Sequence, residues 1–155
     1  ALPIYYVIQG VLGGTFMPPE RAARILGGLR ARLGVYAVLG NHDWWLDAGR
    51  VGRALENNGI ALMENANRVI TVDACQFSLV GIADYWEGPH DLKKAFAGIG
   101  PMSAVVAFTH NPDVFARLAR PISLGIAGHD GPLDRSGTTV LGKERCMHVD
   151  HAKPG

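Results

Sequence analysis

The stretch that decides the fold is VYAVLGNHD, residues 35–43. Its first five residues are apolar and include valine and tyrosine, a composition typical of a short buried strand. The next four, Gly40, Asn41, His42 and Asp43, place an amide oxygen, an imidazole and a carboxylate directly after that strand. These groups are ligands for divalent metal ions. The stretch therefore predicts a strand whose carboxyl end carries a metal site.

Two further histidines stand in the same setting. His110 follows the apolar run 104–109, and His129 follows the run 122–128. In an open α/β sheet, ligands bind beyond the carboxyl ends of the strands, where residues far apart in sequence meet. A single histidine beside an apolar run is more often a hydrogen-bonded core or surface residue than a ligand. Three such histidines in one setting favour a common site.

The remainder of the chain alternates between strand-like and helix-like patterns. Apolar or β-rich runs predict strands at 4–8, 35–39, 60–63, 68–72, 76–82, 104–109 and 122–127. Apolar residues at helical spacing predict helices that begin at Pro19 and stop at Gly34, and at 48–58, 91–99 and 112–119. The runs at 60–63, 68–72 and 76–82 are close together, which predicts antiparallel neighbours. The expected fold class is α/β, with mixed sheets flanked by helices.

Composition and charge exclude several classes of protein. The chain has 155 residues, of which 48% are hydrophobic and 19% charged, as in one folded domain. A net charge of +1 with dispersed basic residues excludes a nucleic-acid-binding patch. No apolar run is long enough to cross a bilayer, which favours a cytoplasmic protein, although an N-terminal tether lying outside this sequence would leave no trace in it. We expect one domain over 1–129 and an irregular or disordered tail over 130–155, which is rich in Gly, Pro and charge.

Taken in order, three motifs resemble those of the calcineurin-like metallophosphoesterases. They are GNHD at 40–43, THNPD at 109–113 and Gly128-His129, and the resemblance extends over 13–129. The strand before GNHD and the pair Trp44-Trp45 after it look like the bacterial phosphodiesterase branch typified by YkuE and YaeI. The resemblance implies an α/β/β/α sandwich that hydrolyses phosphodiesters or phosphomonoesters by metal-activated water with a histidine general acid. A small phosphate ester would be the substrate.

The resemblance also implies a role for each matching residue. Asn41, His110 and His129 would ligate the second of two metal ions in a site that is dinuclear in the family. His42 would be the general acid. Asp43 would either orient the ring of His42 from the second shell or cap a helix or turn, and both alternatives stay open. The donor types suit manganese, iron or zinc.

The sequence departs from the family pattern at both ends. The family's opening Asp-x-His motif has no counterpart, Gln9 stands near the place of an aspartate that bridges both metals, and Gly131 replaces the second histidine of Gly-His-x-His. We therefore expect at most one ion to be well ligated and the family's first strand to be missing. An unpaired sheet edge would then favour self-association.

Three hypotheses remain from the sequence. The first is an active metal-dependent phosphoesterase. The second is a catalytically impaired or inactive piece of that fold, read from a fragment or a shifted frame, that acts at most as a weak metal-binding domain. The third is an α/β protein with chance motif matches, which predicts that Asn41, His110 and His129 lie far apart.

Overall fold

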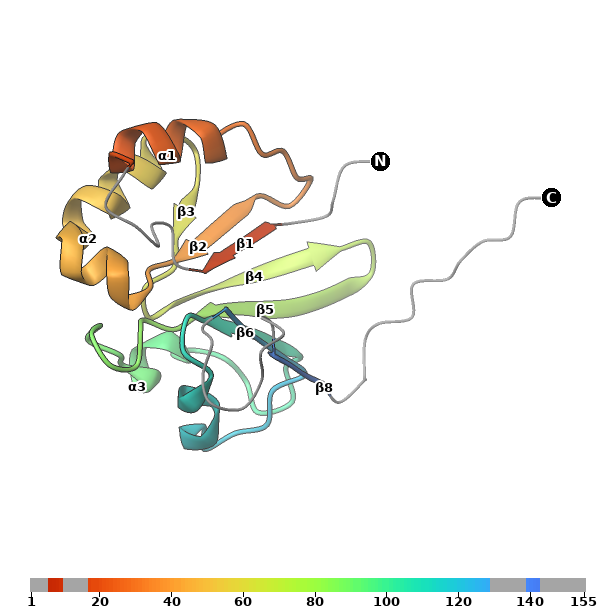
Figure 1. Ribbon diagram of the computed structural model, residues 1–155. Helices are drawn as coiled ribbons and strands as arrows, with labels where there is room; N and C mark the ends of the chain where they lie inside the picture. The colour runs from red at the N-terminus through yellow and green to blue at the C-terminus, as the bar shows by residue number, and fades with distance from the viewer. Residues whose placement is uncertain (1–5, 10–16, 129–138, 143–155) are drawn as a thin grey trace.

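Two β-sheets lie face to face, and helices cover both outer faces (Figure 1). The computed structural model describes the backbone of residues 6–9, 17–128 and 139–142, and the side chains of residues 17–128. Mixed sheets flanked by helices are the predicted fold class, and the structure confirms it.

The first sheet contains three parallel strands in the order β1-β2-β3. They are β1 (Tyr6–Gln9), β2 (Val35–Val38) and β3 (Ala61–Leu62). Two helices, α1 (Pro19–Leu26) and α2 (Asn41–Glu56), pack together on its outer face. This arrangement places the start of α2 directly beyond the carboxyl end of β2.

The second sheet contains five strands in the order β4-β5-β6-β7-β8. They are β4 (Ala66–Val72), β5 (Cys75–Gly81), β6 (Val105–Thr109), β7 (Leu124–Ala127) and β8 (Thr139–Gly142). The central strands β5, β6 and β7 are parallel, and the outer strands pair antiparallel to them. The short helix α3 (Leu92–Ala95) and the 3₁₀ helix η1 (Pro112–Arg117) cover its outer face.

The alternation of side chains along the strands explains the layers, because successive residues of a strand face opposite sides of the sheet. In β2 and the residue after it, Val35, Ala37 and Leu39 pack against the helices, whereas Tyr36 and Val38 pack between the two sheets. The layer between the sheets also holds Met63, Ile70, Leu79 and Phe108. Burying each large apolar side chain contributes about 1.5–3 kcal/mol, so this layer fixes how the sheets stack.

The helix expected from Pro19 to Gly34 is shorter than predicted. α1 ends at Leu26, and Gly27 follows it as the C-cap. The pair Gly27-Gly28 disfavours further helix, since glycine loses the most backbone freedom there. Gly34 has a φ of 108° and lies immediately before β2 rather than at a helix end. Leu29 and Leu33 still join the core, but from the connecting segment.

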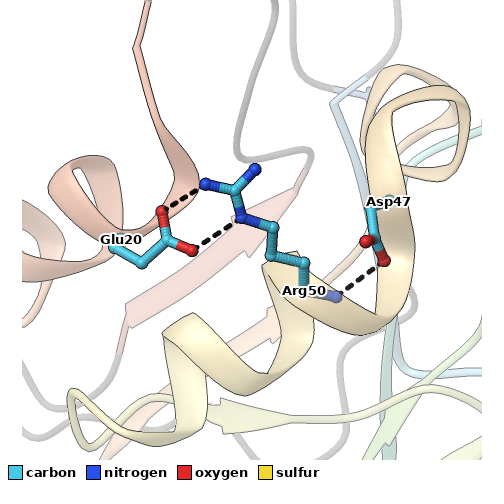
Figure 2. A network of polar contacts seen from close by, with 3 residues as sticks. All are labelled: Glu20, Asp47 and Arg50. Atoms are coloured by element: carbon cyan, nitrogen blue, oxygen red, sulfur yellow. Dashed lines mark hydrogen bonds and ion pairs between the residues drawn. The ribbon is translucent and has the colours of Figure 1, made fainter.

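Helix α2 contains a break that the sequence did not reveal. Asp47 is extended, with φ 177° and ψ 90°, and it divides the helix into two segments. Its Oδ1 accepts a hydrogen bond from the backbone N–H of Arg50 at 2.9 Å, as an N-cap does (Figure 2). The second segment corresponds to the helix expected at 48–58. The Arg50 side chain pairs with Glu20 of α1 through bonds of 2.7 and 2.9 Å.

Two strand predictions need correction. β3 was expected to lie antiparallel to the strand that follows it, but it pairs parallel with β2, and only β4 and β5 form the expected antiparallel pair. Residues 139–142 form β8 within the stretch expected to be irregular. The rest of that stretch, 130–138 and 143–155, lies outside the described residues. The proposed boundary at 129 therefore stays a prediction.

Two predicted helices are also shorter in the structure. α3 spans four residues of the expected 91–99, and η1 is a 3₁₀ helix rather than an α-helix. Within the described residues, no helix has the length and apolar character needed to span a membrane.

Candidate functional site

The first two predicted ligands meet in space. Asn41 follows β2 of the first sheet and His110 follows β6 of the second, and the Oδ1 of Asn41 lies 3.2 Å from the Nε2 of His110. The two residues are 69 positions apart in sequence. The contact joins the two sheets at the edge where both strands end. The hypothesis of chance motif matches predicted that Asn41, His110 and His129 lie far apart. Asn41 and His110 do not, and His129 lies outside the described residues.

The backbone immediately before Asn41 is fixed by a hydrogen bond to the helix that Asn41 begins. Gly40 is the N-cap of α2, and its N–H donates to the Oδ2 of Asp43 at 2.8 Å. Asp43 is fully buried, and Asn41 is 8% exposed. The structure thus gives Asp43 the capping contact that the sequence had left as one of two alternatives. An additional role for Asp43 in orienting His42 stays a prediction.

His42 differs from Asn41 because its side chain is exposed. Its ring stacks on that of Trp45, with the centroids 4.8 Å apart and the planes inclined by 25°. Trp45 is 63% exposed, whereas Trp44 is half-buried against the core under the helices. One tryptophan of the pair therefore packs in the core, as expected, and the other lies at the surface beside His42.

The loop around His110 is built by its neighbours. Thr109 is fully buried, and the Oδ1 of Asn111 accepts the N–H of Asp113 at 2.9 Å and so caps η1. The N–H of Gly128 donates to the carbonyl of His110 at 3.2 Å. The residue before His129 therefore lies beside His110.

The remaining predicted positions cannot be compared with the structure. His129, Gly131 and the side chain of Gln9 lie outside the described residues. Their roles stay predictions from the resemblance.

Two acids with a buried carboxyl oxygen lie beside this edge, and neither was assigned a role from the sequence. Glu64 follows β3, and its Oε1 accepts the N–H of Leu39 at 2.8 Å. Asp84 follows β5, is fully buried, and its Oδ1 accepts the N–H groups of Trp86 and Glu87. Both acids follow an apolar run, which is the pattern that identified Asn41 and His110. If the search for polar residues after apolar runs had included carboxylates as well as histidines, it would have identified both acids as candidates for the site.

The two acids and Asp43 are close enough to influence one another. The pKa of Glu64 is raised to about 7, chiefly by burial and also by the nearby charges of Asp84 and Asp43, while the hydrogen bond from Leu39 acts in the opposite direction. A proton on Glu64 near neutral pH reduces the repulsion among three buried carboxylates. This edge of the protein is therefore polar, buried and sensitive to protonation.

The pair of Asn41 and His110 fits one divalent ion. Two ligand atoms that each lie about 2.1 Å from a shared ion are about 3.0–3.4 Å apart. The observed 3.2 Å separation falls within that range. Among the described residues, no group of three or more His, Cys, Asp or Glu side chains is arranged to hold a metal.

The chain is similar in sequence to the uncharacterized metallophosphoesterase YkoQ of Bacillus subtilis (strain 168). The two chains are 30% identical over 113 residues, which cover 66% of this chain and 42% of that protein. The chain thus spans less than half the length of this relative. The similarity supports the metallophosphoesterase family at most.

Two other comparisons give no match. No protein-family model matches the chain, and no solved structure matches it.

Proposed function

We propose that this chain is part of a metal-dependent phosphoesterase that hydrolyses phosphodiesters or phosphomonoesters, in the branch typified by YkuE and YaeI. The observation that carries the proposal is the 3.2 Å contact between Asn41 and His110, which come from different sheets. The similarity to a metallophosphoesterase supports it independently.

Each residue of the site has a task in this proposal. Asn41, His110 and His129 hold one ion. Manganese, iron or zinc in this place would neutralise charge on the phosphoryl group and activate water. His42 lies one residue from Asn41 and is exposed, so it can reach a bound ester and donate a proton to the leaving oxygen. Asp43 holds the start of α2 and so fixes the backbone from which both side chains project.

A second candidate function is a catalytically impaired domain that binds a single ion weakly. The specific observation in its favour is that the described residues contain no group of three or more His, Cys, Asp or Glu side chains that could hold a metal ion. By the resemblance, Gln9 also stands where an anionic bridge between two ions belongs, and a neutral amide cannot supply that charge.

Metal binding tests the site itself. We expect Mn²⁺ affinity, measured by equilibrium dialysis, to fall at least about tenfold in Asn41→Ala and in His110→Ala. The control is His90→Ala, which removes an exposed imidazole from the loop after β5. Equal affinity in all three variants and in the unmodified chain would contradict the proposed metal site.

Hydrolysis of bis-p-nitrophenyl phosphate in Mn²⁺ separates the two candidate functions. An active enzyme should lose about 100-fold in kcat in His42→Ala while its Mn²⁺ affinity stays the same, since a general acid contributes to turnover and not to metal binding. Binding of Mn²⁺ without turnover in the unmodified chain would favour the impaired domain.

A further inference from the structure

The corner that joins β2 to α2 is held by two carboxylates. The N–H of Leu39 donates to Glu64 and the N–H of Gly40 donates to Asp43, each at 2.8 Å. These are the two residues immediately before Asn41. Asp43 belongs to the same helix as Asn41, but Glu64 reaches the corner from a different element, 25 residues further along the chain.

Glu64 replaces a backbone partner at this corner. The ladder between β2 and β3 continues to the bond from the N–H of Met63 to the carbonyl of Ala37. Two residues further along, the N–H of Leu39 donates to the side chain of Glu64 instead of to a backbone carbonyl. Leu39 is only 2% exposed, so its N–H would lack a partner without Glu64.

The residue after Glu64 anchors it to the second sheet. Asn65 is 6% exposed and has a φ of 53°. Its Oδ1 accepts the N–H groups of Ala83 and Asp91, and its Nδ2 donates to the carbonyl of Pro89. Asn65 thus binds the loop that follows β5, while Glu64 binds the corner that follows β2. The dipeptide links the carboxyl ends of the two sheets.

The bond from Leu39 to Glu64 needs an acceptor oxygen but no charge. The Oε2 of Glu64 is buried and has no hydrogen-bond partner among the described residues. Asp84 and Asp43 both act on Glu64 as like charges. Burying an unpaired charge group is costly, and a glutamine could accept the Leu39 bond without that charge.

We propose that Glu64 is a positioning residue, which holds the β2–α2 corner so that Asn41 meets His110. In this proposal, the corner is held by a side chain long enough to bring an acceptor oxygen to the N–H of Leu39. The negative charge of Glu64 is not required. The consequence for metal binding rests on the proposed function, but the consequence for the corner itself does not.

Two substitutions at position 64 separate the effect of side-chain length from the effect of charge. Glu64→Gln keeps the length of the side chain and an acceptor oxygen but removes the charge. Glu64→Asp keeps the charge but is one methylene shorter, so its carboxylate falls short of Leu39. The control is Glu56→Ala, which removes an exposed carboxylate from α2. All three variants are checked for folding by circular dichroism.

The first readout is independent of any phosphoesterase activity. Nuclear magnetic resonance measures hydrogen exchange of the Leu39 amide and the chemical shift of the Asn41 side-chain amide. We expect Glu64→Asp to speed exchange of Leu39 at least about tenfold and to shift the Asn41 amide. Glu64→Gln and Glu56→Ala should leave both signals near those of the unmodified chain. Unchanged signals in Glu64→Asp, or equal changes in Glu64→Gln, would overturn the inference.

The second readout is Mn²⁺ affinity. Residues that orient metal ligands typically contribute 10–100-fold to affinity. Glu64→Asp should lose about tenfold or more, and Glu64→Gln should stay within about threefold. If the unmodified chain binds no Mn²⁺, the proposed function fails, and the exchange measurement alone decides the role of Glu64. If Mn²⁺ binds and Glu64→Gln loses as much affinity as Glu64→Asp, the charge matters and the inference is wrong.

Discussion

Glu64 should make the stability of the protein fall as the pH rises toward neutrality. The pKa of Glu64 is raised from 4.5 to about 7. Burial is the main cause, Asp84 and Asp43 add to it, and the Leu39 hydrogen bond acts against it. Between these two values the folded protein binds a proton that the unfolded chain has already lost. The free energy of unfolding therefore decreases with pH in this window. The stabilising contribution is complete below about pH 4.5 and is lost as the pH passes through about 7.

The size of the effect follows from the shift. A change from 4.5 to about 7 corresponds to about 3 kcal/mol, since one pKa unit is worth about 1.4 kcal/mol. Glu64→Gln removes the titrating group and keeps an acceptor for Leu39. Relative to this variant, the unmodified chain should lose about 3 kcal/mol between pH 4.5 and about pH 7.5. With a urea m-value of about 2 kcal/mol/M, the midpoints should move relative to each other by about 1.5 M.

Urea unfolding followed by tryptophan fluorescence at a series of pH values measures this difference. Subtracting the variant's curve removes the effect of all other titrating groups that the substitution leaves alone. A difference that stays constant with pH would refute the reasoning. A relative gain in stability of the unmodified chain toward neutral pH would also refute it, because that sign requires a lowered pKa.

Three substitutions test other parts of the structure by urea unfolding. Asp43→Ala should lower the free energy of unfolding by about 1–3 kcal/mol, because the N–H of Gly40 loses its acceptor at a buried helix start, and no loss would contradict the capping role. Gly81→Ala should cost about 3 kcal/mol, since its Cβ would lie 2.1 Å from the carbonyl oxygen of Met63, and a stable variant would exclude this close approach. Arg50→Ala should leave the midpoint unchanged at about 0.15 M salt, because its ion pair is half exposed, and a loss as large as that of Gly81→Ala would contradict this.

The layers of the fold were predictable because they depend on local periodicity. The run at 35–39 shows the composition of a buried strand, and the structure places its alternate residues in two different cores. The partner of β3 was not predictable in the same way. A two-residue strand carries little pattern, and its parallel pairing with β2 is set by the path of α2 across the sheet. The break at Asp47 was also not predictable, because an aspartate within a helical pattern can equally be an exposed residue of an unbroken helix.

The site was predictable as far as its residues resemble metal ligands. Asn41 and His110 were identified from their positions after apolar runs, and the structure brings them together. Glu64 and Asp84 stand in the same kind of position but were assigned no role in the site. A carboxylate after a strand is also the usual residue for a turn, and Asp84 does cap one. Only the burial of both acids, which depends on the packing of the sheets, distinguishes them from ordinary turn residues.

The contact between Asn41 and His110 depends on more than the two loops that carry these residues. Asn41 lies three residues beyond β2 and His110 directly beyond β6, so their separation depends on how the two sheets stack. Tyr36 of β2 and Phe108 of β6 belong to the core between those sheets, and both are almost completely buried. This core determines how the two sheets stack, but it lies between the sheets and away from the edge where Asn41 and His110 meet. At the edge itself, Glu64 binds the corner after β2 and Asn65 binds the loop after β5. Strand β5 lies next to β6, the strand that His110 follows. Since a shift of about 1 Å would take the two donor atoms out of the range for one ion, the core and the contacts of Glu64 and Asn65 must act together.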